Sequence, residues 1–292
     1  GAAAITTALT DYRDAIQFVH DQTVRAMNLG LSPDQAARSV RLPAHLASKP
    51  YLREYYGRVD WSVRAVYSGY LGWFGGNASD LSPLAPAQRA ARLARLGGGR
   101  RQRRRQAAEA AAGGDHRWAL ELADALLALD ASDPEAGEIR ASALTSLGES
   151  EISANGRNYY LSQAMEARGF EQPRFDISST PIELLRALPI DGFMRAMAVN
   201  LDADSALEED TVVAFSFPDA GESYTVHLHR GVARVKTGAA QAPDITVTTD
   251  SLVWKELLAG RRNPMAALAA GKLAVEGGVV ALARFLGHFK AD

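Results

Sequence analysis

Hydrophobic and polar positions follow two different periods along this chain of 292 residues. Over roughly the first two thirds, apolar residues recur at steps of three and four, which places them on one face of a helix. From Thr211 onward they alternate with polar residues, which is typical of strands with one buried face. The pattern predicts a mainly α-helical domain followed by an α+β domain.

Start and stop signals divide the first part into a series of helices. Thr10 can cap a first helix that runs to Met27, and Gly30 can close it in the left-handed conformation. Ser32 followed by Pro33 can begin the next helix. Further helices, rich in alanine, are expected over residues 86–96, 101–112, 115–129, 134–147 and 149–168.

The segment from Tyr55 to Asn77 is rich in aromatic residues and glycine. Its apolar positions share one face of a helix, which we expect to end at Gly75 and Gly76. A face of this kind packs into a core more often than it lines a pocket. It consists of Val63, Val66, Tyr67, Tyr70, Leu71 and Phe74, widened by Trp73.

One pair of helices has the small and large residue pattern of a tetratricopeptide hairpin, over residues 116–129 and 134–147. Such hairpins can offer a surface to partner proteins. Because a stable array needs about three units, we favour a folded part of the helical domain over an interaction surface.

The run from Arg100 to Arg105 also has two interpretations. It could bind phosphate groups through its charge. However, no aromatic residue that could stack on bases lies between Leu96 and His116. We favour a solvated helix start that frays, because cations at this end oppose the helix dipole.

The last part of the chain reads as an antiparallel five-stranded sheet with helices before and after it. The strands are expected over residues 211–217, 223–229, 232–236, 244–248 and 272–276. The helices are expected over residues 181–188, 190–200, 250–259, 263–269 and 277–289.

Composition narrows the function classes. A net charge of −2 and a pI near 6.4 argue against a nucleic-acid-binding protein. No run of eighteen apolar residues occurs, so we expect no transmembrane segment and a soluble protein. The absence of cysteine leaves a bacterial cytoplasm and periplasm equally open. Residues 1–10 lack the basic and apolar regions of a signal peptide, and we interpret them as an artificial leader or the ragged end of a removed domain.

Of the six histidines in the chain, only His227 and His229 lie close together in the sequence. His227 and His229 would point to one face of a strand, and Glu222 or Asp244 could add a third ligand. Two imidazoles alone do not make a site, so we expect no metal and no cofactor in this chain.

Several strings resemble the alkylsulfatases of the metallo-β-lactamase superfamily. A Tyr-Tyr-Gly turn at Tyr55, a Gly-Trp-Phe helix end and a Gly-Asn pair resemble the dimerisation domain of that family, as do residues 155–161. Residues 11–27 resemble the helix that follows the catalytic domain of the family. From about Ile177 the chain resembles the C-terminal domain of sterol-carrier-protein type, notably over residues 252–260, at Pro264-Met265 and at 271–273. The resemblance implies three segments: the lead-in over residues 1–10, a helical dimerisation domain over 11–170, and a lipid-binding or alkyl-binding domain over 176–292.

The resemblance also implies a function. Members of the family cleave long-chain alkyl sulfates with two zinc ions held by a separate domain, whose His-x-His-x-Asp-His motif does not occur in this chain. We therefore expect the homodimeric, hydrophobic substrate-binding portion of an alkyl sulfate hydrolase, without catalytic residues of its own. The zinc domain would belong to the same or a separate chain. The alternatives are a stand-alone protein that binds lipids or alkyl chains, and a helical-repeat interaction module.

The resemblance assigns two groups of binding residues. One would form part of the wall around the sulfate headgroup: Trp61, Arg64, Tyr67 and Trp73. Trp61-Ser62 replaces a His-Asn pair common in the family, and Arg64 could instead pair with Asp60 one turn away. The other group would line an apolar tunnel for the alkyl chain: Phe193, Met197, Phe215, Phe217, Trp254, Leu257, Met265, Leu268, Phe285, Leu286 and Phe289.

Overall fold

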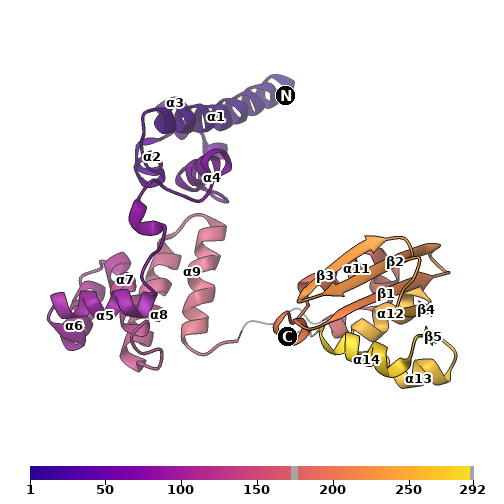
Figure 1. The fold of residues 1–292 in the computed structure, drawn as a ribbon. Coiled ribbons are helices and arrows are strands. Elements are labelled where there is room, and N and C mark those ends of the chain that lie inside the picture. The colour runs from indigo at the N-terminus through magenta and orange to yellow at the C-terminus, as the bar shows by residue number, and fades with distance from the viewer. Residues whose placement is uncertain (172–176, 290–292) are drawn as a thin grey trace. The chain divides into compact units, whose positions relative to one another are not determined.

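A computed structural model describes residues 1–171 and 177–289 (Figure 1). The chain divides into two compact units, Gly1–Gln172 and Pro173–Asp292. In the described residues, no helix is both long and apolar enough to cross a bilayer.

The first unit is helical throughout. Its first three-helix core is made by α1 (Ala2–Asn28), α2 (Pro33–Ser39) and α4 (Val59–Leu71), which bury Val19, Val63 and Tyr67 between them. Two short helices, α3 (Ala44–Ala47) and η1 (Pro50–Leu52), connect α2 to α4. The remaining helices are α5 (Pro86–Leu96), α6 (Gly99–Ala112), α7 (His116–Leu127), α8 (Pro134–Ser150) and α9 (Ala154–Ala167).

Two predicted helix ends in this unit are wrong. The first helix does not begin at Thr10 but at Ala2, so most of the expected lead-in over residues 1–10 is helical. The aromatic helix ends at Leu71, because Gly72 takes a positive φ of 76°, and Trp73 therefore lies beyond it. By contrast, Ser32 begins α2 as expected, with a capping box in which its side chain accepts from the Gln35 amide.

The arginine run lies within α6, and the prediction of a frayed, solvated start is wrong. Arg100 and Arg104 both donate to Asp133, at 2.9 and 2.6 Å, and the side chain of Asp133 has no exposed surface. Arg103 is 9% exposed and donates to the Ala90 carbonyl. These bonds tie α6 to α5 and to the start of α8. The tetratricopeptide-like interpretation of α7 and α8 stays a prediction.

The second unit is an α+β domain, and its helices cover one face of the sheet (Figure 1). The core-facing positions alternate along the strands, for example Val213, Phe215 and Phe217 on β1. The strands are β1 (Asp210–Phe217), β2 (Glu222–His229), β3 (Val232–Thr237), β4 (Ile245–Thr249) and β5 (Leu273–Glu276). The helices are α10 (Ile182–Ala187), α11 (Ile190–Val199), α12 (Ser251–Leu258), α13 (Pro264–Ala269) and α14 (Val279–Gly287).

The sheet is mixed, so the prediction of a purely antiparallel sheet is wrong. In the described residues the strand order is β3-β2-β1-β4-β5, and β4 pairs in parallel with β1. After β3 the chain crosses to the other side of β1 before β4 begins, so β4 runs in the same direction as β1. Alternation of apolar residues reports which side chains are buried but not the direction of a strand.

Candidate functional site

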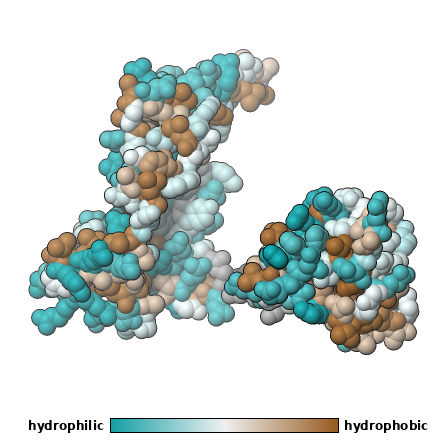
Figure 2. Space-filling model, viewed as in Figure 1, coloured by the Kyte–Doolittle hydropathy of each residue, from teal (hydrophilic) through white to brown (hydrophobic). Residues whose placement is uncertain are grey.

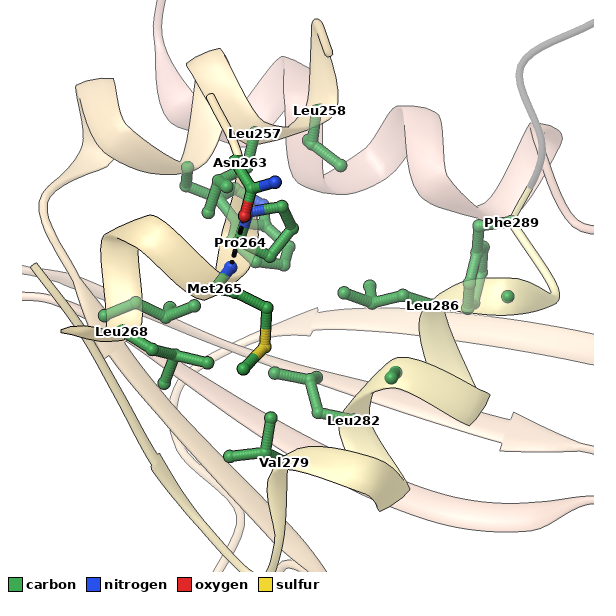
Figure 3. A pocket seen from close by; sticks show the side chains of 14 residues that line it. Leu257, Leu258, Asn263, Pro264, Met265, Leu268, Val279, Leu282, Leu286 and Phe289 are labelled. Carbon is green, nitrogen blue, oxygen red and sulfur yellow. Dashed lines mark hydrogen bonds between the residues drawn. The ribbon is translucent and has the colours of Figure 1, made fainter. Parts of the chain in front are cut away.

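The second unit contains an apolar cavity of about 540 Å³ between α12, α13, β5 and α14 (Figure 3). This volume lies within the range of small-molecule sites, roughly 300–1,000 Å³. Figure 3 shows Met265 and Leu282 pointing toward one another across it. It is lined by Trp254, Leu257, Leu258, Asn263, Pro264, Met265, Leu268, Leu273, Val279, Leu282, Ala283, Leu286, Gly287 and Phe289.

Local sequence signals place the walls of this cavity. Asn263 caps α13, because its side-chain oxygen accepts from the amides of Met265 and Ala266 at 2.9 and 3.1 Å, and Pro264 occupies the first helical position. The turn from β5 into α14 uses Gly277, with φ 89°, whose Cα passes so close to the Asp244 carbonyl that a Cβ would clash. The positions of α13 and α14 therefore depend on a cap and a glycine.

The buried end of the cavity is formed by Trp254, which is 1% exposed. Its ring packs against Phe215 with centroids 4.8 Å apart. Within the described residues its Nε1 has no hydrogen-bond partner. The neighbouring Lys255 is 2% exposed and donates to the Leu188 carbonyl at 2.6 Å, and burial lowers its pKa.

The rim of the cavity is apolar and nearly free of charge. Met265 is 65% exposed and Val280, next to the lining residue Val279, is 84% exposed. Among the described residues that line the cavity, none is charged. Figure 2 shows brown and pale surface gathered over α13 and α14. Within the described lining, a bound ligand would therefore contact no charged side chain.

The structure separates the predicted tunnel residues into two sets. One set lines the cavity: Trp254, Leu257, Met265, Leu268, Leu286 and Phe289. The other set packs in or against the core between sheet and helices and does not line it: Phe193, Met197, Phe215, Phe217 and Phe285. Eight further lining residues were not predicted from the sequence, because neither their size nor their type distinguishes a wall position from a core or surface position: Leu258, Asn263, Pro264, Leu273, Val279, Leu282, Ala283 and Gly287.

The four predicted headgroup residues have different surroundings. Tyr67 is buried in the α1–α2–α4 core, and Trp73 is 74% exposed. Arg64 pairs with Asp34 rather than with Asp60, so the expected pair one helical turn away is wrong. The guanidinium of Arg58 lies over the ring of Trp61, with its central carbon 5.5 Å from the ring centre.

The two strings that carried the resemblance within the helical unit meet in space. Ser153, which caps α9, donates from its hydroxyl to the Tyr56 carbonyl at 2.7 Å. Gly156 in the first turn of α9 faces Trp61, and a Cβ there would come within 3.2 Å of the indole. The glycine of the second string therefore makes room for the tryptophan of the first.

An ion-pair network joins the same two segments. Arg58 donates to Asp60 at 3.0 Å and to Glu151 at 2.7 Å. Burial alone would lower the pKa of Arg58, but its bonds to the two carboxylates raise it. Burial alone would raise the pKa of Glu151, but a hydrogen bond from the Ser153 amide and the charge of Arg58 lower it. Both groups therefore stay charged at neutral pH.

A second hollow of about 520 Å³ lies beside this network, between α1, residues 52–59 and α4. Its lining includes two arginines, one glutamate and one histidine as well as polar and apolar side chains: Arg53, Arg58, Glu54 and His20, with Val59 and Val66 among the apolar residues. Among the described residues that line it, none of the four predicted headgroup residues occurs. Their role at a headgroup stays a prediction.

Only one group of three metal-binding side chains occurs in the described parts of the chain: Asp210, His227 and His229. Glu222 and Asp244, which could have added a third ligand, are not part of this group. Glu222 accepts from the Tyr224 hydroxyl and Asp244 from the Val212 amide. A pair of catalytic zinc ions needs more ligands than three, so the described residues do not fit such a centre.

Comparisons with known proteins agree with the two units. A sequence model described as alkyl sulfatase dimerisation matches residues 32–169, and one described as alkyl sulfatase C-terminal matches residues 178–291. A linear primary-alkylsulfatase of Pseudomonas sp. (strain ATCC 19151) is 37% identical over 298 residues, covering 99% of this chain and 56% of the relative. An (R)-specific secondary-alkylsulfatase of Pseudomonas sp is 32% identical over 289 residues, covering 98% of this chain and 43% of the relative.

A solved structure gives the same result. The stereoselective inverting sec-alkylsulfatase Pisa1 from Pseudomonas sp. superposes with a TM-score of 0.91 at 31% identity. The match covers 100% of this chain and 46% of that one. The chain thus spans about half the length of the curated relatives it matches.

Proposed function

We propose that this chain, which belongs to the alkylsulfatase family through its dimerisation and C-terminal domains, binds the alkyl chain of a long-chain sulfate ester in its second unit. The observation that carries the proposal is the cavity of about 540 Å³ between α12, α13 and α14, with its uncharged lining. Cavities of this kind favour apolar ligands, because removing the apolar surfaces of ligand and wall from water is favourable in free energy.

The energetics of such binding follow from the buried methylenes. A twelve-carbon chain that buried nearly all of them would gain up to about 9 kcal/mol, at about 0.8 kcal/mol each. The loss of free translation and rotation removes part of this gain. A net gain of about 5 to 8 kcal/mol leaves a dissociation constant between about 200 µM and 1 µM.

The headgroup should contribute little in this chain alone. Among the described lining residues the polar side-chain groups are the amide of Asn263, whose oxygen caps α13, and the indole Nε1 of Trp254 at the buried end, and neither carries a charge that would select an anion. Sulfate, carboxylate and alcohol should therefore bind with similar affinity at equal chain length.

Calorimetric titration of the whole chain with ten- to sixteen-carbon ligands below their micelle concentration tests the proposal. Affinity should rise steadily with chain length and change little between the three headgroups. Affinity that does not depend on chain length, or the absence of binding, would refute alkyl-chain binding by this unit.

We further propose that hydrolysis needs a zinc-binding domain supplied in the same or a separate chain. In support, the described residues offer three metal-binding side chains in one place, fewer than a two-zinc centre needs. The whole chain, assayed with dodecyl sulfate and added Zn²⁺, should release no sulfate. Release of sulfate that depends on the added metal would contradict this part of the proposal.

Homodimer formation through α1 completes the proposal. Ile5, Leu9, Tyr12 and Ile16 lie at spacings of four, three and four and are 48–68% exposed. The same stripe continues into Val19, which is buried against α2 and α4. An apolar stripe of this spacing favours pairing with another helix. Sedimentation at micromolar concentration should give twice 31.3 kDa, and a monomer with intact helical circular dichroism would contradict the dimer.

A further inference from the structure

The open face of the sheet in the second unit carries a cluster of two imidazoles and one carboxylate. Alternation along β2 places Tyr224, Val226 and Leu228 in the core, so His227 and His229 point to the opposite face. Asp210 is the residue on β1 directly opposite His229 in the antiparallel register. Strand pairing therefore brings Asp210 of β1 next to the two histidines of β2, which lie two residues apart on that strand.

The geometry of this Asp210–His227–His229 cluster matches a metal site. Asp210 Oδ1 lies 2.8 Å from His227 Nε2 and 3.3 Å from His229 Nδ1, and all three ligand atoms lie within 4.8 Å of one another. Ligands about 2.1 Å from a tetrahedral ion are about 3.4 Å apart, so small side-chain rotations would admit one. The centres of the two imidazole rings are 5.5 Å apart.

An unpartnered nitrogen in the cluster also suits a cation. His229 Nδ1 is buried, and in the described residues it has no hydrogen-bond partner of good geometry. Arg234 is opposite His227 on β3 and weakens cation binding through its charge, but its side chain is exposed and can turn into solvent.

We propose that Asp210, His227 and His229 form a binding site for one divalent transition-metal ion, of which Zn²⁺ is the reference. Two nitrogens and one oxygen suit Zn²⁺, Ni²⁺ and Cu²⁺, whereas Mg²⁺ requires oxygen ligands. The three ligands leave a fourth position, which water fills or a side chain of another molecule completes. The site lies on the open face of the sheet, whereas the cavity lies on the helical side, so metal binding should be independent of alkyl-chain binding.

Titration of the whole chain, purified without a histidine tag, with ZnCl₂ at pH 7.5 tests the site. One ion per chain should bind with a dissociation constant on the order of 10 µM. His229→Ala and Asp210→Asn should each weaken binding at least tenfold, and MgCl₂ should give no signal. His45→Ala removes an exposed imidazole in the other unit and should leave the affinity unchanged.

Two results would overturn the site. Zinc binding of wild-type strength in the His229→Ala and Asp210→Asn variants would place the ion elsewhere. The absence of binding at millimolar Zn²⁺ would show that the cluster is only a hydrogen-bonded group. Because the cluster residues are at least partly exposed, the variants should keep the wild-type circular dichroism, which separates lost ligands from lost folding.

Discussion

A phenyl ring inserted into the cavity should block the alkyl chain without disturbing the core. Ala283 lines the cavity from α14 and is itself exposed, so Ala283→Phe removes no buried contact. A cavity that accommodates a benzene ring measures about 150 Å³, which is about a quarter of the 540 Å³ found here. The ring would therefore displace about three of twelve methylenes.

The loss follows from the same scale as the binding energy. Three methylenes at about 0.8 kcal/mol each amount to about 2.4 kcal/mol, which is a factor of about 50 in the dissociation constant of a twelve-carbon ligand. A shorter, eight-carbon chain needs less of the cavity and should lose less. The effect should therefore grow with chain length, which a general loss of folding would not produce.

Ala281→Phe is the matched control. Ala281 is exposed on the same helix but does not line the cavity, so the same ring should change affinity less than twofold. Calorimetric titration of both variants with eight- and twelve-carbon sulfates measures the difference. Equal affinities in both variants, whether high or low, would refute the assignment of this cavity to the alkyl chain.

Three further variants test other parts of the structure. Leu9→Lys on α1 should convert the dimer into a folded monomer in sedimentation, whereas Leu96→Lys, at a still more exposed site on α5, should not. Asp133→Asn keeps the cap of α8 but removes the charge that two arginines of α6 share, and should destabilise the helical unit by about 2 kcal/mol in urea at pH 7. Those arginines hold the pKa of Asp133 well below its usual range, so the wild type should be more stable than the variant above about pH 4. This difference in the free energy of unfolding should shrink progressively at lower pH, as Asp133 takes up a proton. A difference that does not change with pH would show that the two ion pairs are weak. Gly277→Ala should destabilise the second unit by about 2–4 kcal/mol in calorimetric unfolding, because its Cβ would clash with a carbonyl at the start of β4, and an unchanged transition would show that the turn can move.

The order of helices and strands could be predicted from the sequence because each element has its own spacing of apolar residues and is bounded by turn or capping residues. The strands β1 and β2 lie within one residue of the expected bounds, since alternation and turn residues are local signals. The parallel pairing of β4 with β1 was not predicted, because it depends on where the chain goes between strands. Similarly, the arginines of α6 appeared solvated because their partner, Asp133, lies 29 residues or more further along the chain.

The candidate site was predicted less completely than the fold. In the sequence, Phe215 and Leu268 are both simply large apolar residues. In the structure Phe215 fills the core, whereas Leu268 lines the cavity. Which side of an element faces a space is decided by packing, and the sequence alone does not report it. The third member of the histidine cluster was missed for a related reason, because Asp210 reaches His229 only through strand register.

The most direct test of alkyl-chain binding is to locate the chain itself. A crystal of the protein grown with dodecyl sulfate that carries bromine on its terminal carbon would mark the end of the chain by anomalous scattering. If the alkyl chain binds in the cavity, one bromine peak per chain should lie between Leu268 on α13 and Leu282 on α14. A bromine peak only in the hollow between α1 and α4, or only at the surface, would contradict it.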